Sequence, residues 1–192
     1  MLHVLRQIAR IGIRTEPAPS PASTDVAAAR LQRQILDTLG RALTIRHVDA
    51  GSCNACELEA HALLNPYYNI EGLGIRFVAS PRHADALLVT GPVSKHMAIA
   101  LQRTYDATPE PKLVIAAGDC ACGNGMFADS YATVGAVDRM LPVDVRIPGC
   151  PPSPTALLQG ILAAITTAAP PPPRVEPSLA RPEAKDAPPP IE

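Results

Sequence analysis

The sequence predicts an α/β domain built on a parallel sheet with helices on both faces. Short apolar runs rich in β-branched residues recur along the chain, and helical segments lie between most of them. Strands that are apolar along nearly their whole length are typical of a parallel sheet covered on both sides. The chain has 192 residues, 47% hydrophobic and 18% charged, which suffices for one ordinary domain with a sizeable core.

The core begins at Leu43, and the expected strands follow it at 44–48, 75–78, 86–90, 113–117 and 143–147. Helices are expected between most of these strands, at 56–64, 94–105 and 131–140. A last helix is expected from Ser153 and Pro154 to residue 169, because serine caps helices well and proline suits the first turn. Together these elements predict a domain of flavodoxin-like scale.

Proline marks both ends of the chain. Twelve of the 22 prolines lie before residue 22 or after residue 169. The predicted organisation is a basic amphipathic segment with a proline-rich linker at 1–23, an α/β domain at 24–169 and a proline-rich tail at 170–192. The tail has no apolar periodicity, and we expect it to be disordered.

Residues 1–14 have the periodicity of a basic amphipathic helix. Apolar residues and arginines both recur at helical spacing, namely Val4, Ile8 and Ile11, and Arg6, Arg10 and Arg14. Such a helix can lie on an anionic membrane surface or in a partner's groove. The alternative is a poorly ordered tail with chance periodicity. A second helix is expected at 25–41, with Thr24 as its N-cap.

Charge and composition exclude several classes of protein. The net charge of −1 and the scarcity of aromatic residues argue against nucleic-acid binding. No glycine-rich phosphate loop is present, so no nucleotide site is expected. The sequence has no apolar run long enough to span a bilayer, and arginines interrupt what would be a signal peptide. We therefore expect a cytoplasmic location, where thiols stay reduced.

Four of the five cysteines directly follow predicted strands. Cys53 and Cys56 come after the first strand, Cys120 after the fourth and Cys150 after the fifth. Loops that leave the carboxyl ends of parallel strands converge on one crevice, where ligands bind. Three separate loops are therefore expected to bring four thiols to one edge of the sheet.

Four thiolates at one point suit an iron–sulfur cluster or a structural zinc ion. Structural zinc sites usually use two local pairs, whereas only one pair is local here, so the spacing favours a 4Fe–4S cluster and leaves zinc as the alternative. A redox pair of the thioredoxin kind would not account for Cys120 and Cys150. Cys122 is interpreted as a small buried thiol beside the cluster, with substitution for Cys120 as ligand the alternative.

Seven short motifs then occur in a familiar order: GSCNACELE at 51–59, ASPRHAD at 79–85, TGPV at 90–93, PEPK at 109–112, GDCA at 118–121, PVDV at 142–145 and IPGCPP at 147–152. Over residues 44 to 169 the chain resembles the 20-kDa subunit family of respiratory complex I and the small subunits of energy-converting nickel–iron hydrogenases. The resemblance implies a flavodoxin-like fold that carries one 4Fe–4S cluster on Cys53, Cys56, Cys120 and Cys150.

One departure separates the branches of this family. Its quinone-reductase members carry two adjacent cysteines at the first ligand site, whereas two residues separate Cys53 from Cys56 here, as in the hydrogenase branch. The chain thus resembles the small subunit of a membrane-bound, complex I-related hydrogenase of the formate hydrogenlyase type. The alternatives are the cluster-bearing subunit of an NADH:quinone oxidoreductase and, outside redox chemistry, a zinc-stabilised interaction module.

The resemblance also implies a setting for the chain. The cluster would pass single electrons to or from an active site in a large catalytic subunit, and this chain would not be catalytic alone. The other implied partners are membrane subunits and a ferredoxin-like electron-transfer subunit. The complex would lie at the cytoplasmic face of the inner membrane, with this chain bound peripherally.

Three further side chains are candidates for moving protons or tuning charge near the cluster. Glu59 follows Cys56 by one helical turn, Arg82 lies in the second motif and Asp119 precedes Cys120. Each has a plainer interpretation as well: an interface glutamate, a surface arginine and a residue that stabilises its own loop.

Overall fold

The computed structural model describes residues 42–127 and 130–167, together with single helical positions at 3, 6, 9, 10 and 33. Apart from those single positions, the predicted segment 1–23, the predicted helix 25–41 and the predicted tail 170–192 lie outside the described residues. Among the residues that the structure describes, no helix is both long and apolar enough to cross a lipid bilayer.

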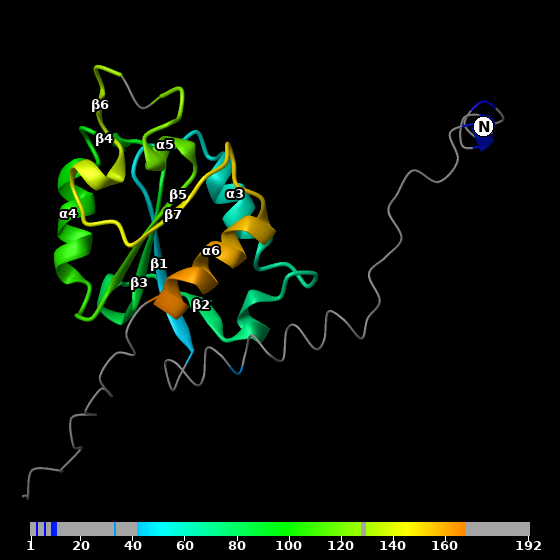
Figure 1. Cartoon of the computed structure of the whole chain (residues 1–192), viewed down its shortest axis with the longest axis horizontal. Helices are drawn as coiled ribbons and strands as arrows, with labels where there is room; N and C mark the ends of the chain where they lie inside the picture. Colours follow the sequence, from blue (N-terminus) through cyan, green and yellow to red (C-terminus); the bar gives the residue numbers. More distant parts are fainter. Residues whose placement is uncertain are drawn as a thin grey trace, which may run out of the picture.

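A five-stranded parallel sheet runs through the middle of the domain (Figure 1). Its strands are β1 (Leu43–Asp49), β2 (Ile75–Phe77), β3 (Ala86–Thr90), β5 (Leu113–Ala117) and β7 (Val145–Ile147). They lie in the order β2-β1-β3-β5-β7, which is the 2-1-3-4-5 order of flavodoxin-like sheets when the five are counted along the chain. The predicted parallel α/β fold is confirmed, and its switch point lies between β1 and β3.

Helices cover both faces of the sheet, as Figure 1 shows. On one face, α3 (Ala55–Ala62) and α6 (Pro154–Thr167) bury a core that includes Leu88 and Ile115. On the other face, α4 (Ala98–Ala107) and the short α5 (Asp119–Cys122) bury a core that includes Leu87. Because consecutive strand residues point to opposite faces, each apolar strand serves both cores.

Short 3-10 helices and a two-stranded ribbon complete the described domain. The 3-10 helices are η1 (Ile70–Leu73), η2 (Pro81–His83) and η3 (Val137–Arg139). The ribbon pairs β4 (Val93–Ser94) with β6 (Thr133–Gly135) in antiparallel orientation.

The helix predicted at 131–140 is wrong, because β6 and η3 occupy this segment. Thr133 and Val134 are β-branched and suit a strand, and Gly135 has a φ of +115°, which no helix allows. The helix predicted from residue 94 begins later, at Ala98, because Ser94 belongs to β4 and pairs with Thr133. The local sequence alone does not show this pairing.

The start of α6 was predicted correctly. Pro154 is its first residue, and the Ser153 hydroxyl oxygen accepts the N–H of Ala156 at 3.3 Å. Since α6 packs on β7 and runs back along the sheet, its end at Thr167 lies near the edge where β1 begins (Figure 1). The chain thus enters the sheet and leaves α6 at the amino edge.

Candidate functional site

The carboxyl ends of four strands lie level with one another. Asp49 pairs with Thr90, Thr90 with Ala117 and Ala117 with Ile147, so these residues form one row across the sheet. The loops that follow β1, β3, β5 and β7 therefore leave the sheet at one height and meet above it. In open α/β sheets this edge is where ligands bind.

A pocket of about 300 Å³, part of it open to solvent, lies where these loops meet. Its walls come from all four loops and comprise Ser52, Cys53, Ala55, Cys56, Gly91, Asp119, Cys120, Gly149, Cys150 and Pro151. The structure thus brings together the four cysteines that the sequence analysis singled out. Among the described residues, no group of three or more histidine, cysteine, aspartate or glutamate side chains is placed to hold a single metal ion.

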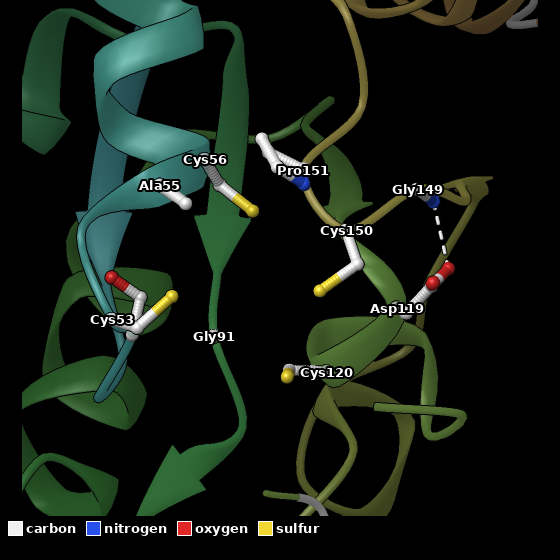
Figure 2. Close-up of a pocket in the computed structure, with 10 residues that line it drawn as sticks. Cys53, Ala55, Cys56, Gly91, Asp119, Cys120, Gly149, Cys150 and Pro151 are labelled. Carbon is white, nitrogen blue, oxygen red and sulfur yellow. Dashed lines mark hydrogen bonds between the residues drawn. The ribbon is translucent and has the colours of Figure 1, made fainter. Parts of the chain in front are cut away.

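The four thiols form two pairs that face each other across the pocket (Figure 2). Cys53 and Cys56 come from the start of α3 on one wall, and Cys120 and Cys150 lie on the opposite wall, with all four sulfurs directed into the space between. Cys53 and Cys150 are exposed, whereas the other two are half-buried, and none of the four is in a disulfide.

The first pair is positioned by the loop that joins β1 to α3. The Asp49 carboxylate accepts the N–H groups of Gly51 and Ser52, both at 2.8 Å, and so fixes the turn before Cys53. Burial acts to raise the pKa of this carboxyl, but the hydrogen bonds from Ser52 and Gly51 outweigh it, and the pKa lies below its usual value. Asn54 then takes a left-handed conformation that starts α3, which places Cys56 in the first helical turn.

Two glycines make room for the sulfurs. A Cβ at Gly118 would lie 2.6 Å from Cys56 Sγ, and Gly118 also has a φ of +95° that L side chains rarely adopt. A Cβ at Gly125 would collide with Cys120 Sγ. The sulfurs therefore rest against bare backbone, which leaves the pocket side of each thiol free.

The pocket disfavours uncompensated thiolates. Burial raises the pKa of the Cys56 thiol to about 12, and the neighbouring Glu57 carboxylate adds to this shift. Burial likewise raises the pKa of Cys120. Thiols of this kind stay protonated at neutral pH unless a positively charged centre replaces the protons.

Cys122 does not line the pocket. It lies on the far side of α5, where its sulfur is 3.6 Å from the carbonyl oxygen of Ala116 and 3.8 Å from that of Ile147. Burial raises the pKa of this thiol. Its surroundings are those of a small half-buried side chain at the edge of the core that covers one face of the sheet.

The structure separates the three other predicted residues. Asp119 lines the pocket, but Glu59 on α3 is half-buried and does not. Arg82 is exposed on η2, which precedes β3, and the neighbouring His83 carbonyl bonds to Thr44 at the beginning of β1. Arg82 therefore lies at the amino edge of the sheet, away from the four cysteines.

Sequence reasoning missed a buried polar group behind the first pair. Glu57 is 8% exposed, and its Oε1 accepts the hydroxyl of Thr90, while the Oε2 atom has no hydrogen-bond partner. His47 Nε2 lies 3.0 Å from that hydroxyl and 3.7 Å from Glu57 Oε1. Burial lowers the pKa of His47, although Glu57 opposes the shift. The available signal was the position of Glu57 between Cys56 and the helix face that carries Ala60.

Comparison with known proteins agrees with this geometry. A model of the family described as NADH ubiquinone oxidoreductase, 20 Kd subunit, matches residues 53–164, a range that includes all four pocket cysteines. A probable membrane-bound hydrogenase subunit of Pyrococcus furiosus is 46% identical over 132 residues, which are 69% of this chain and 79% of that protein. Formate hydrogenlyase subunit 7 of Escherichia coli is 42% identical over 147 residues, which are 77% of this chain but only 58% of that protein.

A third relative belongs to a different complex. This subunit of the NADH-quinone oxidoreductase of Desulfovibrio desulfuricans is 46% identical over 123 residues, which are 64% of this chain and 66% of that protein. Among solved structures, a chain of an archaeal membrane-bound sulfane sulfur reductase aligns with a TM-score of 0.59 and 31% identity over 71% of this chain and 74% of that one. A chain of an NAD+-reducing [NiFe]-hydrogenase, at 17% identity and a TM-score of 0.53 over 68% of this chain and 94% of that one, shows the shared fold. The chain belongs to the family of the NADH ubiquinone oxidoreductase 20 Kd subunit, whose members are subunits of oxidoreductase complexes.

Proposed function

We propose that the chain is the electron-transfer subunit of a membrane-associated, complex I-related nickel–iron hydrogenase of the formate hydrogenlyase type. It carries one 4Fe–4S cluster on Cys53, Cys56, Cys120 and Cys150. The observation that carries this proposal is the convergence of four thiols from three loops on one pocket at the switch edge of the sheet. Two relatives named as a hydrogenase subunit and a formate hydrogenlyase subunit support the hydrogenase assignment.

The residues of the pocket fit such a cluster. Four cysteine thiolates are its usual ligands, and when bound it gains and loses one electron at a time. Gly118 and Gly125 leave space beside two of the sulfurs, which a side chain would fill. The raised pKa of Cys56 means that its proton leaves only when positive charge takes its place, so ligation releases protons.

The pocket also suits a partner that covers it. Leu58 on α3 is 62% exposed, and Met126, in the loop that touches Cys120, is 83% exposed. Exposed apolar side chains beside a functional pocket are typical of a protein interface. We propose a large catalytic subunit as this partner, in a complex that also contains membrane subunits and a ferredoxin-like subunit and lies at the cytoplasmic face of the inner membrane.

The cluster-bearing subunit of an NADH:quinone oxidoreductase is the second candidate. It is favoured by the 46% identity to the Desulfovibrio desulfuricans protein. The hydrogenase proposal is preferred because two residues separate Cys53 from Cys56, the arrangement that the sequence analysis associated with the hydrogenase branch.

Metal analysis of the anaerobically purified chain tests the cluster. We expect about four iron and four sulfide per chain, with the electron paramagnetic resonance signal of a reduced cluster. A colourless chain with zinc and no iron or sulfide would instead support the zinc-stabilised module. Purification of the native complex then separates the two redox candidates, because nickel and hydrogen uptake are expected only for the hydrogenase.

A further inference from the structure

An aspartate ties β5 to β7 at the pocket end of this strand pair. The Asp119 N–H donates to the Gly149 carbonyl oxygen at 2.8 Å, and the Gly149 N–H donates to Asp119 Oδ1 at 2.7 Å. Figure 2 shows the second of these bonds on the wall that carries Cys120 and Cys150. The tie therefore uses both the backbone and the side chain of Asp119.

Both ends of the tie adjoin a predicted ligand. Asp119 directly precedes Cys120, and Gly149 directly precedes Cys150. Two hydrogen bonds between Asp119 and Gly149 thus restrict the distance between the backbones of the two cysteines. A metal-ligating side chain needs such support, because groups outside the ligand set orient the ligands themselves.

The Cys150 loop has few other polar contacts. Three of the residues at 148–152 are prolines, which have no N–H to donate. Within the described residues, the hydrogen bonds of this loop to other parts of the domain are the two that join Gly149 to Asp119. Cys150 itself is exposed, so packing restrains it little.

From this geometry we infer that Asp119 is a positioning residue that holds Cys120 and Cys150 at the spacing the cluster needs. The inference rests on the proposed function and assigns the second pair of ligands its own support. It makes the carboxylate oxygen, as a hydrogen-bond acceptor, the important feature of Asp119. Electrostatic tuning by its charge would be a different role.

Substitution separates these two roles. Asp119→Asn removes the charge but keeps an oxygen that can accept the Gly149 N–H, whereas Asp119→Ala removes both. If position matters, the asparagine variant holds the cluster as the native chain does. If charge matters, asparagine and alanine have similar effects.

The same strand pair offers a matched control at its other end. Asp144 Oδ2 accepts the Val114 N–H at 2.7 Å, and the Asp144 N–H donates to the Val114 carbonyl oxygen at 2.9 Å. This tie has the same form and joins the same two strands, but neither Asp144 nor Val114 lines the pocket. Asp144→Ala therefore removes an equivalent tie without touching the ligand loops.

The experiment compares the native full-length chain with Asp119→Ala, Asp119→Asn and Asp144→Ala, all purified anaerobically. Iron and sulfide per chain, the resonance signal of the reduced cluster and the rate of iron loss to a chelator are measured beside the thermal unfolding temperature. We expect Asp119→Ala to lose iron roughly 10-fold faster than the native chain, the scale of effect for removing an outer partner of a metal ligand. Asp119→Asn and Asp144→Ala should keep the native signal and the native rate of iron loss.

Three results would overturn the inference while the proposed function stands. They are a native rate of iron loss in Asp119→Ala, an equal loss in Asp119→Asn, and an equal loss in Asp144→Ala. If Asp119→Ala fails to fold, Asp119→Asn still decides, since an altered signal or faster iron loss there contradicts the positioning role. A native chain without iron and sulfide overturns the proposed function and this inference together.

Discussion

At the residue scale, Cys56 illustrates how the pocket treats its thiols. Its sulfur rests against the backbone of Gly118, and the buried Glu57 carboxyl follows it in α3. Burial first, and then the charge of Glu57, raises the pKa of Cys56 to about 12. Since thiolates and not thiols bind metals, occupancy of this pocket is coupled to proton release and weakens as the pH falls.

The cysteines differ in what their loss should do. Changing Cys150 to serine removes one of four thiols in the pocket and should abolish or strongly alter the cluster spectrum. Changing Cys122 to serine should leave the cluster assembled, because its sulfur faces the Ala116 and Ile147 carbonyls instead of the pocket and a hydroxyl can bond to the same oxygens. Iron content and the visible spectrum of both variants check this. Loss of the cluster in the Cys122 variant would make that residue a ligand.

His47 gives the chain a predictable dependence on acid. Burial lowers its pKa from 6.5, so the folded state resists a proton that the unfolded state accepts. Its contribution to stability is therefore complete above pH 6.5 and is lost as the pH falls toward the folded-state pKa. Unfolding temperatures measured between about pH 5 and 8 should fall more steeply in the native chain than in His47→Gln. Parallel curves for the two chains would contradict this.

At the element scale, the strands show what local sequence determines. The segments 86–90 and 113–117 were predicted with their observed bounds, because β3 and β5 are apolar throughout and nearly all of their residues are buried. By contrast, β6 is formed by pairing with β4, across nearly 40 residues of chain, and no local pattern shows that contact.

The site was predictable in part for the same reason. The rule that loops meet at the carboxyl edge brought the four cysteines together, and the structure places all four on one pocket. Glu57 was missed because the sequence gives helix spacing but not which face of α3 is buried; the structure buries Glu57 and Ala60 there. Arg82 was placed near the cysteines by its motif, but its position before β3 puts it at the other edge of the sheet.

The contact between Gly118 and Cys56 joins two ligand loops and can be tested. Gly118→Ala forces a Cβ to 2.6 Å from Cys56 Sγ and strains a backbone at φ +95°. Gly123→Ala is the matched control, because Gly123 also has a φ of +95° but its Cβ would meet only Ala136. Both changes should cost roughly 1–3 kcal/mol of unfolding free energy. Only Gly118→Ala should also lower the iron content, and an equal loss in both variants would contradict a specific contact.

At the scale of the whole molecule, exposed apolar side chains surround the pocket and suit a partner's surface. Changing Leu58 to glutamate should weaken assembly with the proposed catalytic subunit about tenfold, or about 1.4 kcal/mol, without loss of iron. Ile99 is a suitable control, since it is 65% exposed against 62% for Leu58 but lies on α4, which covers the other face of the sheet. Copurification of the native complex with each variant measures this. Equal weakening by both would show that the surface around the pocket is not special.

The level strand ends have a further consequence for how the domain can be held. Because the ligand loops share one edge, and because β1 begins and α6 ends near the other, the pocket and the two points of attachment are opposite poles of the domain. Anchoring by either end leaves the thiols facing outward. A chain immobilised on an electrode through its terminus would therefore present its pocket to the solution, whereas immobilisation through a residue of α3 would turn that pocket toward the surface.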